Sequence, residues 1–400
     1  MIAHRSTWTG IAFGLSLAYF AAYQQFKLPP ALPILLQTYG YDRALAGGFM
    51  SIYAAAGLIL SIPLARLLER LGILAPVIAA LGCMVAGCAI GLLAPENGWL
   101  MLAGRGLEGI GFAVLAIAGP VLANANATVR LLPLVAGLNA SWVPIGQLGA
   151  TAAAPIAFAG PGWPLLWWLG IAGALALAVW AGVLHRGRRI DFAPSRSAGG
   201  EKPPALRHTS LVLAAGAFMI FSGQYYAYMT WLPQYLVEVH GLSPSMAVLG
   251  YTVPPAALIA TTLVLAAVLR AGVPLGPLLV AGMATQTAVW WLIPVTGGGL
   301  GGVISLIVYG IGAGFVPTCL FAVPSVLAGS GRPPPSAFGI LMTGRNLGVL
   351  VGPVLLALAF KSSGGWDVAS PIFGALSTFG LVLCVWLAFV LGGARYGMSR

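Results

Sequence analysis

Charged residues are the scarcest class in this 400-residue chain. Asp, Glu, Lys and Arg together make up 7% of it, and only 8 residues are acidic. A soluble domain needs about a quarter of its residues charged to cover a water-facing surface. Because 59% of the residues are hydrophobic, the composition excludes an ordinary soluble enzyme or binding domain. It indicates a protein whose surface faces lipid.

Cysteine is also rare, and its placement excludes two further classes of site. The chain has 4 cysteines, Cys83, Cys88, Cys319 and Cys384, and all of them lie in apolar stretches without a C-x-x-C spacing. We interpret them as small core residues and not as a disulfide framework. The 4 histidines have no metal-ligand spacing either. No metal ion or cofactor is expected.

A glycine-rich run, "GIGAGF" at 310–315, is the one stretch that resembles an enzyme motif. A dinucleotide fingerprint needs a preceding strand and an acidic residue at a set distance beyond it, and neither is present. We interpret the run as a helix-packing surface. The sequence therefore predicts no enzymatic activity.

Twelve segments are long and apolar enough to cross a bilayer, since a spanning helix needs about 20 apolar residues. A polar stretch at 185–208, rich in Arg, Pro and Gly, predicts a flexible linker between an N-terminal bundle (1–184) and a C-terminal bundle (209–400). We expect an all-α integral membrane fold with twelve transmembrane helices in two pseudo-symmetric six-helix bundles. The predicted spans are 8–36, 44–66, 73–94, 98–125, 133–158, 163–184, 209–237, 244–270, 275–297, 299–328, 334–360 and 367–392.

Basic residues are distributed unevenly between the two ends of these spans. With the N-terminus inside, fourteen of the 19 Lys and Arg residues fall on cytoplasmic segments, and two, Arg43 and Lys361, fall on the opposite face. Positive charge is retained on the cytoplasmic side during insertion. We therefore expect a multi-pass protein of the cell membrane, such as a bacterial inner membrane, with both termini in the cytoplasm. The net charge of +11 is then a topology signal, and no nucleic-acid partner is expected.

The two halves resemble each other at an offset near 200 residues. Residues 20–40 align with 221–241, 108–114 with 309–315, and 137–149 with 339–351. The last pair matches Gly146 with Gly348. Two similar halves in the same orientation can rock against each other around a site at their interface, which is the geometry of alternating access.

The segment "LAGRGLEGIG" at 102–111 resembles the fourth-helix motif of the major facilitator superfamily. In that motif an Arg is followed by an acidic or amide residue and by G-x-G, and Arg105, Glu108, Gly109 and Gly111 occupy these positions. The likeness extends over the whole chain. It implies the two-bundle fold and the activity of a secondary carrier.

Two further motifs of that family are present only in part. The loop "ARLLERLG" at 65–72 is similar to the family's gating motif, with Glu69, Arg70 and Gly72 as its acid, base and turn. Its counterpart in the second half, at 267–274, lacks the acid. The helix-5 signature of the family's drug-efflux antiporters lacks its Gly-Pro pair here, which argues against drug efflux.

Lys27 is one of three cations in the interior of the predicted spans. At about 1.5 Å per residue it lies some 13 Å within the end of the first span. Tyr23 and Gln24 share its helical face. Either Pro29 and the prolines after it end the helix, so that Lys27 reaches the membrane interface, or this polar stripe lines a cavity and contacts a solute. We favour the second interpretation.

Arg345 lies near the middle of the eleventh span, next to Asn346. One interpretation is a salt bridge across the bundle to Glu108, or hydrogen bonds to main-chain carbonyls. The other is a solute contact, because a guanidinium presents a planar fork that suits carboxylates and other oxyanions. We favour the solute contact.

Arg105 and Glu108 are three residues apart on the fourth span and can form a local ion pair. Glu108 is also the only acidic residue in the interior of a predicted span. Because burial favours the protonated form of a carboxyl group, Glu108 is the candidate that would titrate in a proton-coupled carrier. The structural and the coupling interpretation are both open.

Polar and aromatic residues supply the remaining candidate solute contacts. Gln224, Tyr225 and Tyr228 are spaced along the seventh span at the level of the first-span candidates, and Tyr228 aligns with the first-span lysine at offset 201. Asn139 and Trp142 are the candidates on the fifth span.

These observations predict a secondary active or facilitative carrier of a small organic anion, working by alternating access. Its partners would be the solute, the lipid bilayer and, in a symporter, protons. One rival is a multidrug or metabolite efflux antiporter of the same fold. The other is a membrane sensor or scaffold, which would bind a ligand without moving it.

Overall fold

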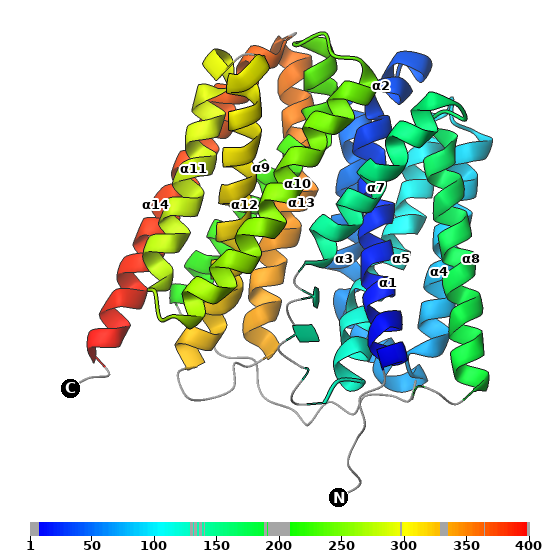
Figure 1. The fold of residues 1–400 in the computed structure, drawn as a ribbon, viewed down its shortest axis with the longest axis horizontal. Helices are drawn as coiled ribbons and strands as arrows, with labels where there is room; N and C mark the ends of the chain where they lie inside the picture. Colours follow the sequence, from blue (N-terminus) through cyan, green and yellow to red (C-terminus); the bar gives the residue numbers. More distant parts are fainter. Residues whose placement is uncertain are drawn as a thin grey trace, which may run out of the picture. The chain divides into compact units, whose positions relative to one another are not determined.

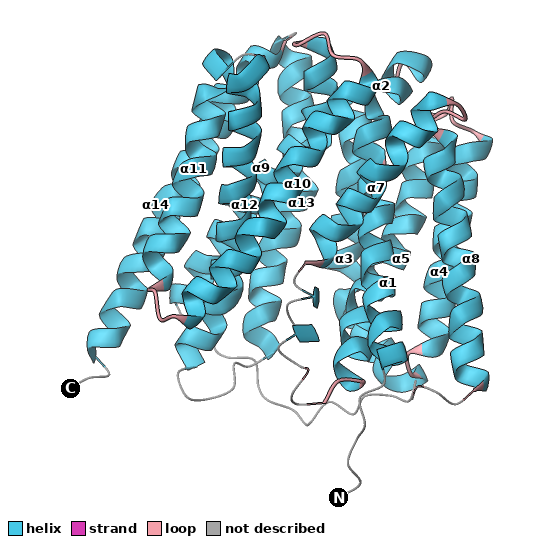
Figure 2. Ribbon diagram, viewed as in Figure 1, coloured by secondary structure: helices cyan, strands magenta, loops and turns pink. Residues whose placement is uncertain are grey.

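The computed structural model describes residues 8–128, 131, 134–135, 138–139, 141–187, 190, 209–296, 298–328, 335–363 and 365–397. Within these ranges, side chains are described except at 60–71, 266, 270, 325, 335–336, 338, 362–363 and 392–397. All regular structure in the described residues is helical (Figure 2). The chain divides into two compact units, Met1–Gly199 and Gly200–Arg400. Most of the predicted linker lies outside the described residues.

The first unit has helices at every span predicted for it (Figure 1). Helix α1 packs against α5 and α7, α5 against α3 and α4, and α4 against α8. Asp42 and Asn97 cap α3 and α5, because each side chain accepts hydrogen bonds from two main-chain N–H groups of the first turn. The helices are α1 (Trp8–Phe26), α2 (Leu28–Tyr39), α3 (Arg43–Leu71), α4 (Leu74–Leu93), α5 (Gly98–Ala125), α7 (Trp142–Ala159) and α8 (Pro164–Arg186).

The regular structure in the described residues of the second unit is also helical. Helix α9 packs against α13 and α14, and α12 packs against α10 and α11. The elements are α9 (Thr209–Glu238), α10 (Pro244–Arg270), α11 (Leu275–Thr296), α12 (Gly299–Ala328), α13 (Pro335–Ser363), the 3-10 helix η1 (Trp366–Val368) and α14 (Ala369–Gly397).

The glycines that align between the halves make equivalent helix contacts. A Cβ atom at Gly146 of α7 would overlap the carbonyl oxygen of Tyr19 on α1, and one at Gly348 of α13 would overlap that of Met219 on α9. Without a side chain the two backbones can approach closely, which is how membrane helices commonly pack. The internal repeat is therefore visible in the packing as well as in the sequence.

The first predicted span is not one continuous helix. The chain breaks at Lys27, which separates α1 from α2. Pro29 follows, and because proline has no N–H it cannot donate to the carbonyl of Gln25 four residues earlier. In a membrane such a break is tolerated only where neighbouring groups bond the released carbonyls.

Nine helices among the described residues are long and apolar enough to cross a membrane. Many large apolar side chains are exposed on their surfaces, such as Leu93 on α4, Val179 on α8 and Phe389 on α14. Exposed apolar side chains at this density suit lipid and not water. The predicted all-α membrane fold is confirmed.

Candidate functional site

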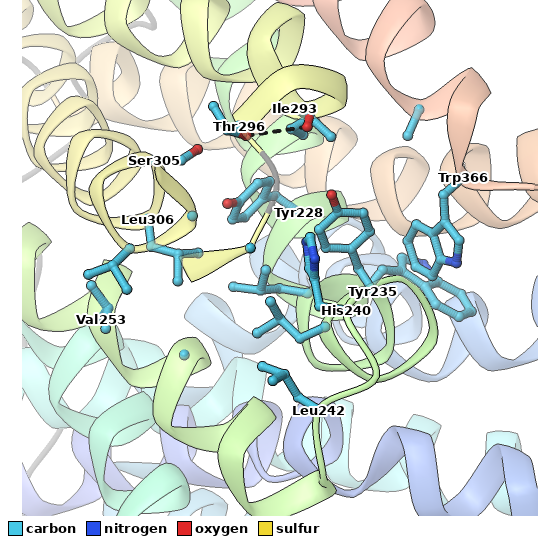
Figure 3. A pocket seen from close by; sticks show the side chains of 18 of the residues that line it. Tyr228, Tyr235, His240, Leu242, Val253, Ile293, Thr296, Ser305, Leu306 and Trp366 are labelled. Atoms are coloured by element: carbon cyan, nitrogen blue, oxygen red, sulfur yellow. Dashed lines mark hydrogen bonds between the residues drawn. The ribbon is translucent and has the colours of Figure 1, made fainter. Parts of the chain in front are cut away.

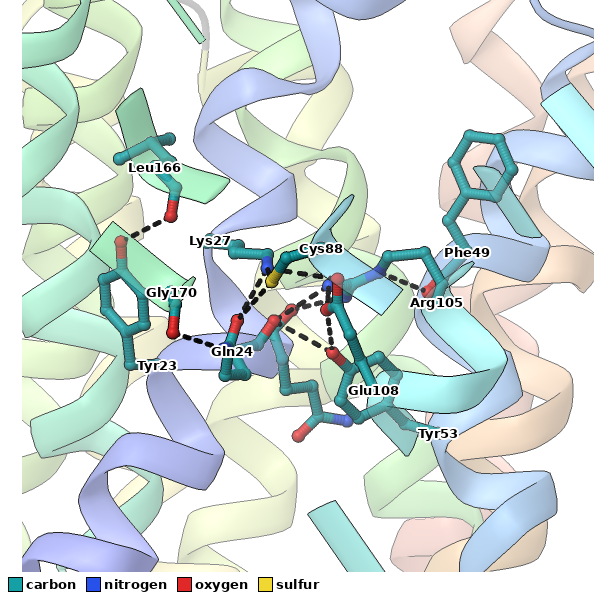
Figure 4. A network of polar contacts seen from close by, with 11 residues as sticks. Tyr23, Gln24, Lys27, Phe49, Tyr53, Cys88, Arg105, Glu108, Leu166 and Gly170 are labelled. Carbon is teal, nitrogen blue, oxygen red and sulfur yellow. Dashed lines mark hydrogen bonds and ion pairs between the residues drawn. The ribbon is translucent and has the colours of Figure 1, made fainter. Parts of the chain in front are cut away.

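A buried polar cluster occupies the break between α1 and α2 (Figure 4). Lys27, Arg105 and Glu108 all have an exposed fraction of 0%. We call this group and the side chains of Gln24, Tyr53 and Cys88 the Lys27 cluster. It joins residues of α1, α3, α4 and α5 to the break itself.

Glu108 is the central acceptor of the Lys27 cluster. Its Oε1 lies 3.1 Å from Lys27 Nζ, and its Oε2 lies 2.7 Å from Arg105 Nη1. The Tyr53 hydroxyl donates to Oε2 at 2.5 Å. Both carboxylate oxygens thus accept bonds from protein donors, as an ionised carboxylate does.

Arg105 bonds the main chain at the helix break. Its Nη2 donates to Gln25 O at 2.9 Å, and Gln25 O is the carbonyl that Pro29 cannot bond. Its Nη1 also donates to Gln24 O at 2.8 Å, and its Nε donates to Phe49 O on α3 at 3.2 Å. The guanidinium therefore compensates for the interrupted helix while it pairs with Glu108.

Lys27 is held entirely by protein groups within the described residues. Its Nζ donates to Gln24 Oε1 at 2.6 Å and to Cys88 Sγ at 3.0 Å, besides its ion pair with Glu108. It also lies 4.7 Å from the ring centre of Trp167. The prolines do break the helix, but Lys27 does not extend to the interface. The solute-contact role predicted for it stays a prediction.

The Lys27 cluster contains two cations and one carboxylate. Burying an ion costs several kcal/mol unless it is paired and fully hydrogen-bonded. The carbonyl, thiol and amide acceptors around the two cations stabilise the positive charge that the single carboxylate does not balance. Gly87 on α4 and Gly104 on α5 allow the close approach that places Glu108 there, since a Cβ atom at either would overlap the opposite helix.

The other predicted residues of the first unit have separate surroundings. The Tyr23 hydroxyl donates to Leu166 O at 2.8 Å. Asn139 Nδ2 lies 3.4 Å from Asn124 Oδ1, and the Trp142 ring lies 5.5 Å from that of Phe112. The structure does not bring these three into the Lys27 cluster.

The predicted gating loop is described only in part. Its Gly72 ends α3 with φ 73°, a left-handed conformation that favours glycine. The side chains of Glu69 and Arg70 lie outside the described residues.

The second unit has an uncharged cluster that includes Tyr228 and Tyr309, which align with Lys27 and Glu108 in the repeat. Gln224 Oε1 accepts from Trp290 Nε1 at 2.5 Å and from the Tyr309 hydroxyl at 2.9 Å, and Gln224 Nε2 donates to Gln286 Oε1. Tyr228 stacks on Tyr309 with ring centres 3.8 Å apart. We call these five residues the Gln224 cluster. Two of the predicted solute contacts, Gln224 and Tyr228, belong to this cluster. The ring of Tyr225, the third predicted contact on this helix, stacks on that of Tyr309 with ring centres 6.3 Å apart.

Arg345 on α13 is only partly buried, in contrast to Lys27. Its Nη2 donates to the Tyr226 hydroxyl at 2.6 Å, and its Nη1 donates to Asn346 Oδ1 at 3.0 Å. The Tyr226 ring lies 5.5 Å away. No carboxylate forms a salt bridge with Arg345 among the described residues. Glu108 pairs within its own unit instead.

A model of the Major Facilitator Superfamily matches residues 12–334. This chain belongs to that superfamily. As a family member it is a membrane transporter and not an enzyme, which confirms both predictions.

A solved structure supports the fold of this family member. The chain is similar to a crystal structure of a mutant of the nucleoside transporter NupG, with a TM-score of 0.73 and 13% sequence identity. The match covers 96% of this chain and 99% of that chain. At this identity the likeness establishes the fold alone. No curated protein sequence matches the chain.

Several cluster residues were not among the sequence candidates. Tyr53 and Cys88 in the first unit, and Gln286, Trp290 and Tyr309 in the second, bond the candidates directly. Tyr309 had a usable signal, because at offset 201 it aligns with Glu108. The others lie on helices for which the repeat alignment gave no match.

Proposed function

We propose that the chain is a secondary carrier of a small organic anion and that Arg345 is its principal anion contact. The observation that carries the proposal is the unbalanced charge of Arg345. It is a cation well inside a membrane helix, and no carboxylate neutralises it among the described residues. Retained membrane charges mark solute paths or relays more often than structural positions.

The surroundings of Arg345 suit an oxyanion. A guanidinium has five N–H donors, and the bonds to Tyr226 and Asn346 use two of them. Gly344 and Gly348 flank it, and because they have no side chain α13 can pack closely against α9. Carboxylates accept paired bonds from such a fork. In this proposal Tyr226 and Asn346 hold the guanidinium in place while its free edge binds the anion.

The Lys27 cluster then has a structural role in this conformation. Its ion pairs connect α5 with the α1–α2 break, and no exposed surface of Lys27 or Glu108 is available to a solute. Proton coupling through Glu108 stays a prediction, since a proton would have to displace one of its three donors. If uptake into vesicles is unchanged when an imposed pH gradient is collapsed, that prediction is wrong.

Uptake into proteoliposomes tests the anion proposal. Labelled mono- and dicarboxylates are compared with uridine, because the similar solved structure is that of a nucleoside transporter. Arg345→Ala should lower carboxylate uptake by roughly tenfold or more, since a hydrogen bond to a charged group is worth about 1.5–3 kcal/mol. The matched control is Lys361→Gln, which removes a cation at the exposed end of the same helix.

Three outcomes decide between the candidates. Carboxylate uptake that falls only in Arg345→Ala supports the proposal. Uridine uptake that is unaffected by Arg345→Ala rejects the anion while retaining a carrier. Ligand binding without any flux would favour a sensor or scaffold.

A further inference from the structure

The second unit has a partly open cavity of about 540 Å³ where α9, α11 and α13 end and α10, α12 and η1 begin (Figure 3). Its wall has an unusual concentration of aromatic rings. Six of them line it: Tyr228, Trp231, Tyr235, His240, Trp290 and Trp366. Among the described residues that line it, none is Asp, Glu, Lys or Arg. Arg345 is not part of this wall.

Hydrogen bonds directed away from the cavity hold the three tryptophans. Trp290 donates to Gln224, and Trp366 donates to Glu238 Oε2 at 2.6 Å. Trp231 donates to a main-chain carbonyl of α13 at 3.0 Å. Since each indole N–H is already bonded, the rings are oriented in advance. Rings that do not need to reorder on binding lower its entropic cost.

Four polar side chains in the wall have no hydrogen-bond partner among the described residues. They are Tyr228, Tyr235, His240 and Ser305. Tyr235 packs edge to face against His240 with ring centres 5.1 Å apart, and edge to face against Trp366 at 5.2 Å. Unpartnered hydroxyl and imidazole groups beside a largely apolar wall can donate to or accept from a guest.

We propose that this cavity binds an uncharged, planar aromatic molecule. Its ring system would pack among Tyr228, Tyr235 and Trp290, and its polar edge would bond the free hydroxyl and imidazole groups. The volume falls within the range of about 300–1,000 Å³ that is typical of small-molecule sites. A charged guest is disfavoured because it would meet no counter-charge in the wall. The site is independent of the anion contact at Arg345.

Isothermal titration calorimetry on the full-length protein in nanodiscs tests this site with three matched probes. They are 2-naphthamide, its fully saturated analogue and 2-naphthoate, which separate ring aromaticity from shape and from charge. We expect 2-naphthamide to bind roughly tenfold tighter than the saturated analogue, since stacked and edge-to-face contacts with the rings of the wall favour an aromatic guest. The naphthoate should bind more weakly than the amide by a similar factor.

Two variants on α12 locate the binding. Ser305→Phe places a ring into the cavity and should abolish 2-naphthamide binding. Ile304→Phe adds a ring at the neighbouring exposed position, outside the wall, and should leave the affinity unchanged. If Ser305→Phe does not fold, Tyr235→Leu removes one ring and one hydroxyl from the wall and should weaken binding by about tenfold.

The remaining outcomes overturn the proposal. Equal affinity for the saturated analogue would mean an apolar cavity without aromatic recognition, such as one that takes a lipid chain. Tighter binding of the naphthoate, or unchanged binding in Ser305→Phe, would place the ligand elsewhere. Absence of binding by all three probes would reject the site. None of these results bears on carboxylate uptake, so this inference and the anion proposal can fail separately.

Discussion

The two units place opposite chemistry at matching positions. At an offset of 201, Lys27 aligns with Tyr228 and Glu108 with Tyr309. The first pair forms a fully buried ion pair at 3.1 Å, and the second forms a pair of stacked rings 3.8 Å apart. The same two helix positions are in contact in each unit. The repeat thus keeps the two positions in contact, but an ion pair in the first unit is replaced by stacked aromatic rings in the second.

In both clusters a tyrosine hydroxyl lies close to a main-chain carbonyl of the first described helix of its unit, α1 or α9. The Tyr53 hydroxyl oxygen lies 3.1 Å from Gln24 O, and the Tyr309 hydroxyl oxygen lies 3.3 Å from Gln224 O. The two clusters differ in how much stability each should lose when one of its polar groups is removed. A buried charge left without its partner costs far more than a buried neutral group left without one. The first unit should therefore respond more strongly to substitution.

Removal of the single acid should produce the largest effect. Glu108→Gln leaves two buried cations without a counter-charge, and breaking a buried pair in this way costs about 3–5 kcal/mol. The free energy of unfolding, measured by SDS titration in mixed micelles, should fall by that amount or no folded protein should be recovered. A loss under about 1 kcal/mol would mean that the ions are not buried as described.

Removal of the lysine should cost less, although it belongs to the same ion pair. Lys27→Met leaves Arg105 and Glu108 as a balanced pair, so the loss is that of hydrogen bonds to a charged group, about 1.5–3 kcal/mol. The same titration compares it with Glu108→Gln. Equal losses for the two variants would contradict the count of two cations against one acid.

Removal of the central amide tests the uncharged cluster. Gln224→Met leaves the Trp290 N–H without its acceptor and the Tyr309 hydroxyl with only the main-chain carbonyl of residue 224. An unsatisfied buried group costs about 1–3 kcal/mol. Unfolding of the second unit should become easier, while uptake that depends on Arg345 should persist. A loss as large as that of Glu108→Gln would remove the contrast between the units.

The smallest effect is expected from the hydroxyl of Tyr309. Tyr309→Phe keeps the ring that stacks on Tyr228 and removes only the bonds to Gln224. Hydrogen bonds between membrane helices contribute about 0.6 kcal/mol on average. Tyr53→Phe is the matched change in the first unit and should cost more, because that hydroxyl bonds a carboxylate. The reverse order would show that charge does not set the difference.

Much of the architecture could be predicted because it follows from local composition. The apolar spans, the motif around Arg105 and Glu108, and the repeated glycines all imply contacts within a few residues or along one helix face. Lys27 shows where this reasoning ends. Its position beside Pro29 indicated a broken helix, but an extended lysine and a buried one have the same local sequence. Its partner Glu108 is 81 residues away.

Cys88 and Trp167 make the same point. Each contacts Lys27, yet nothing in the stretches around them distinguishes them from other apolar core residues. The cavity of the second unit is a similar case, because its aromatic rings come from four separate segments of the chain. A helix face can be predicted from periodicity, whereas the set of faces that meet depends on packing among several helices.

By itself, the sequence determined the class of solvent, the helical spans and the existence of two related halves. The bilayer requires each spanning segment to be apolar and helical, so these properties can be predicted from each segment separately. Only the tertiary structure decided which cation is neutralised and which is not. Lys27 and Arg345 are both cations within predicted apolar spans, and their difference arises from whether a neighbouring helix brings a carboxylate within reach.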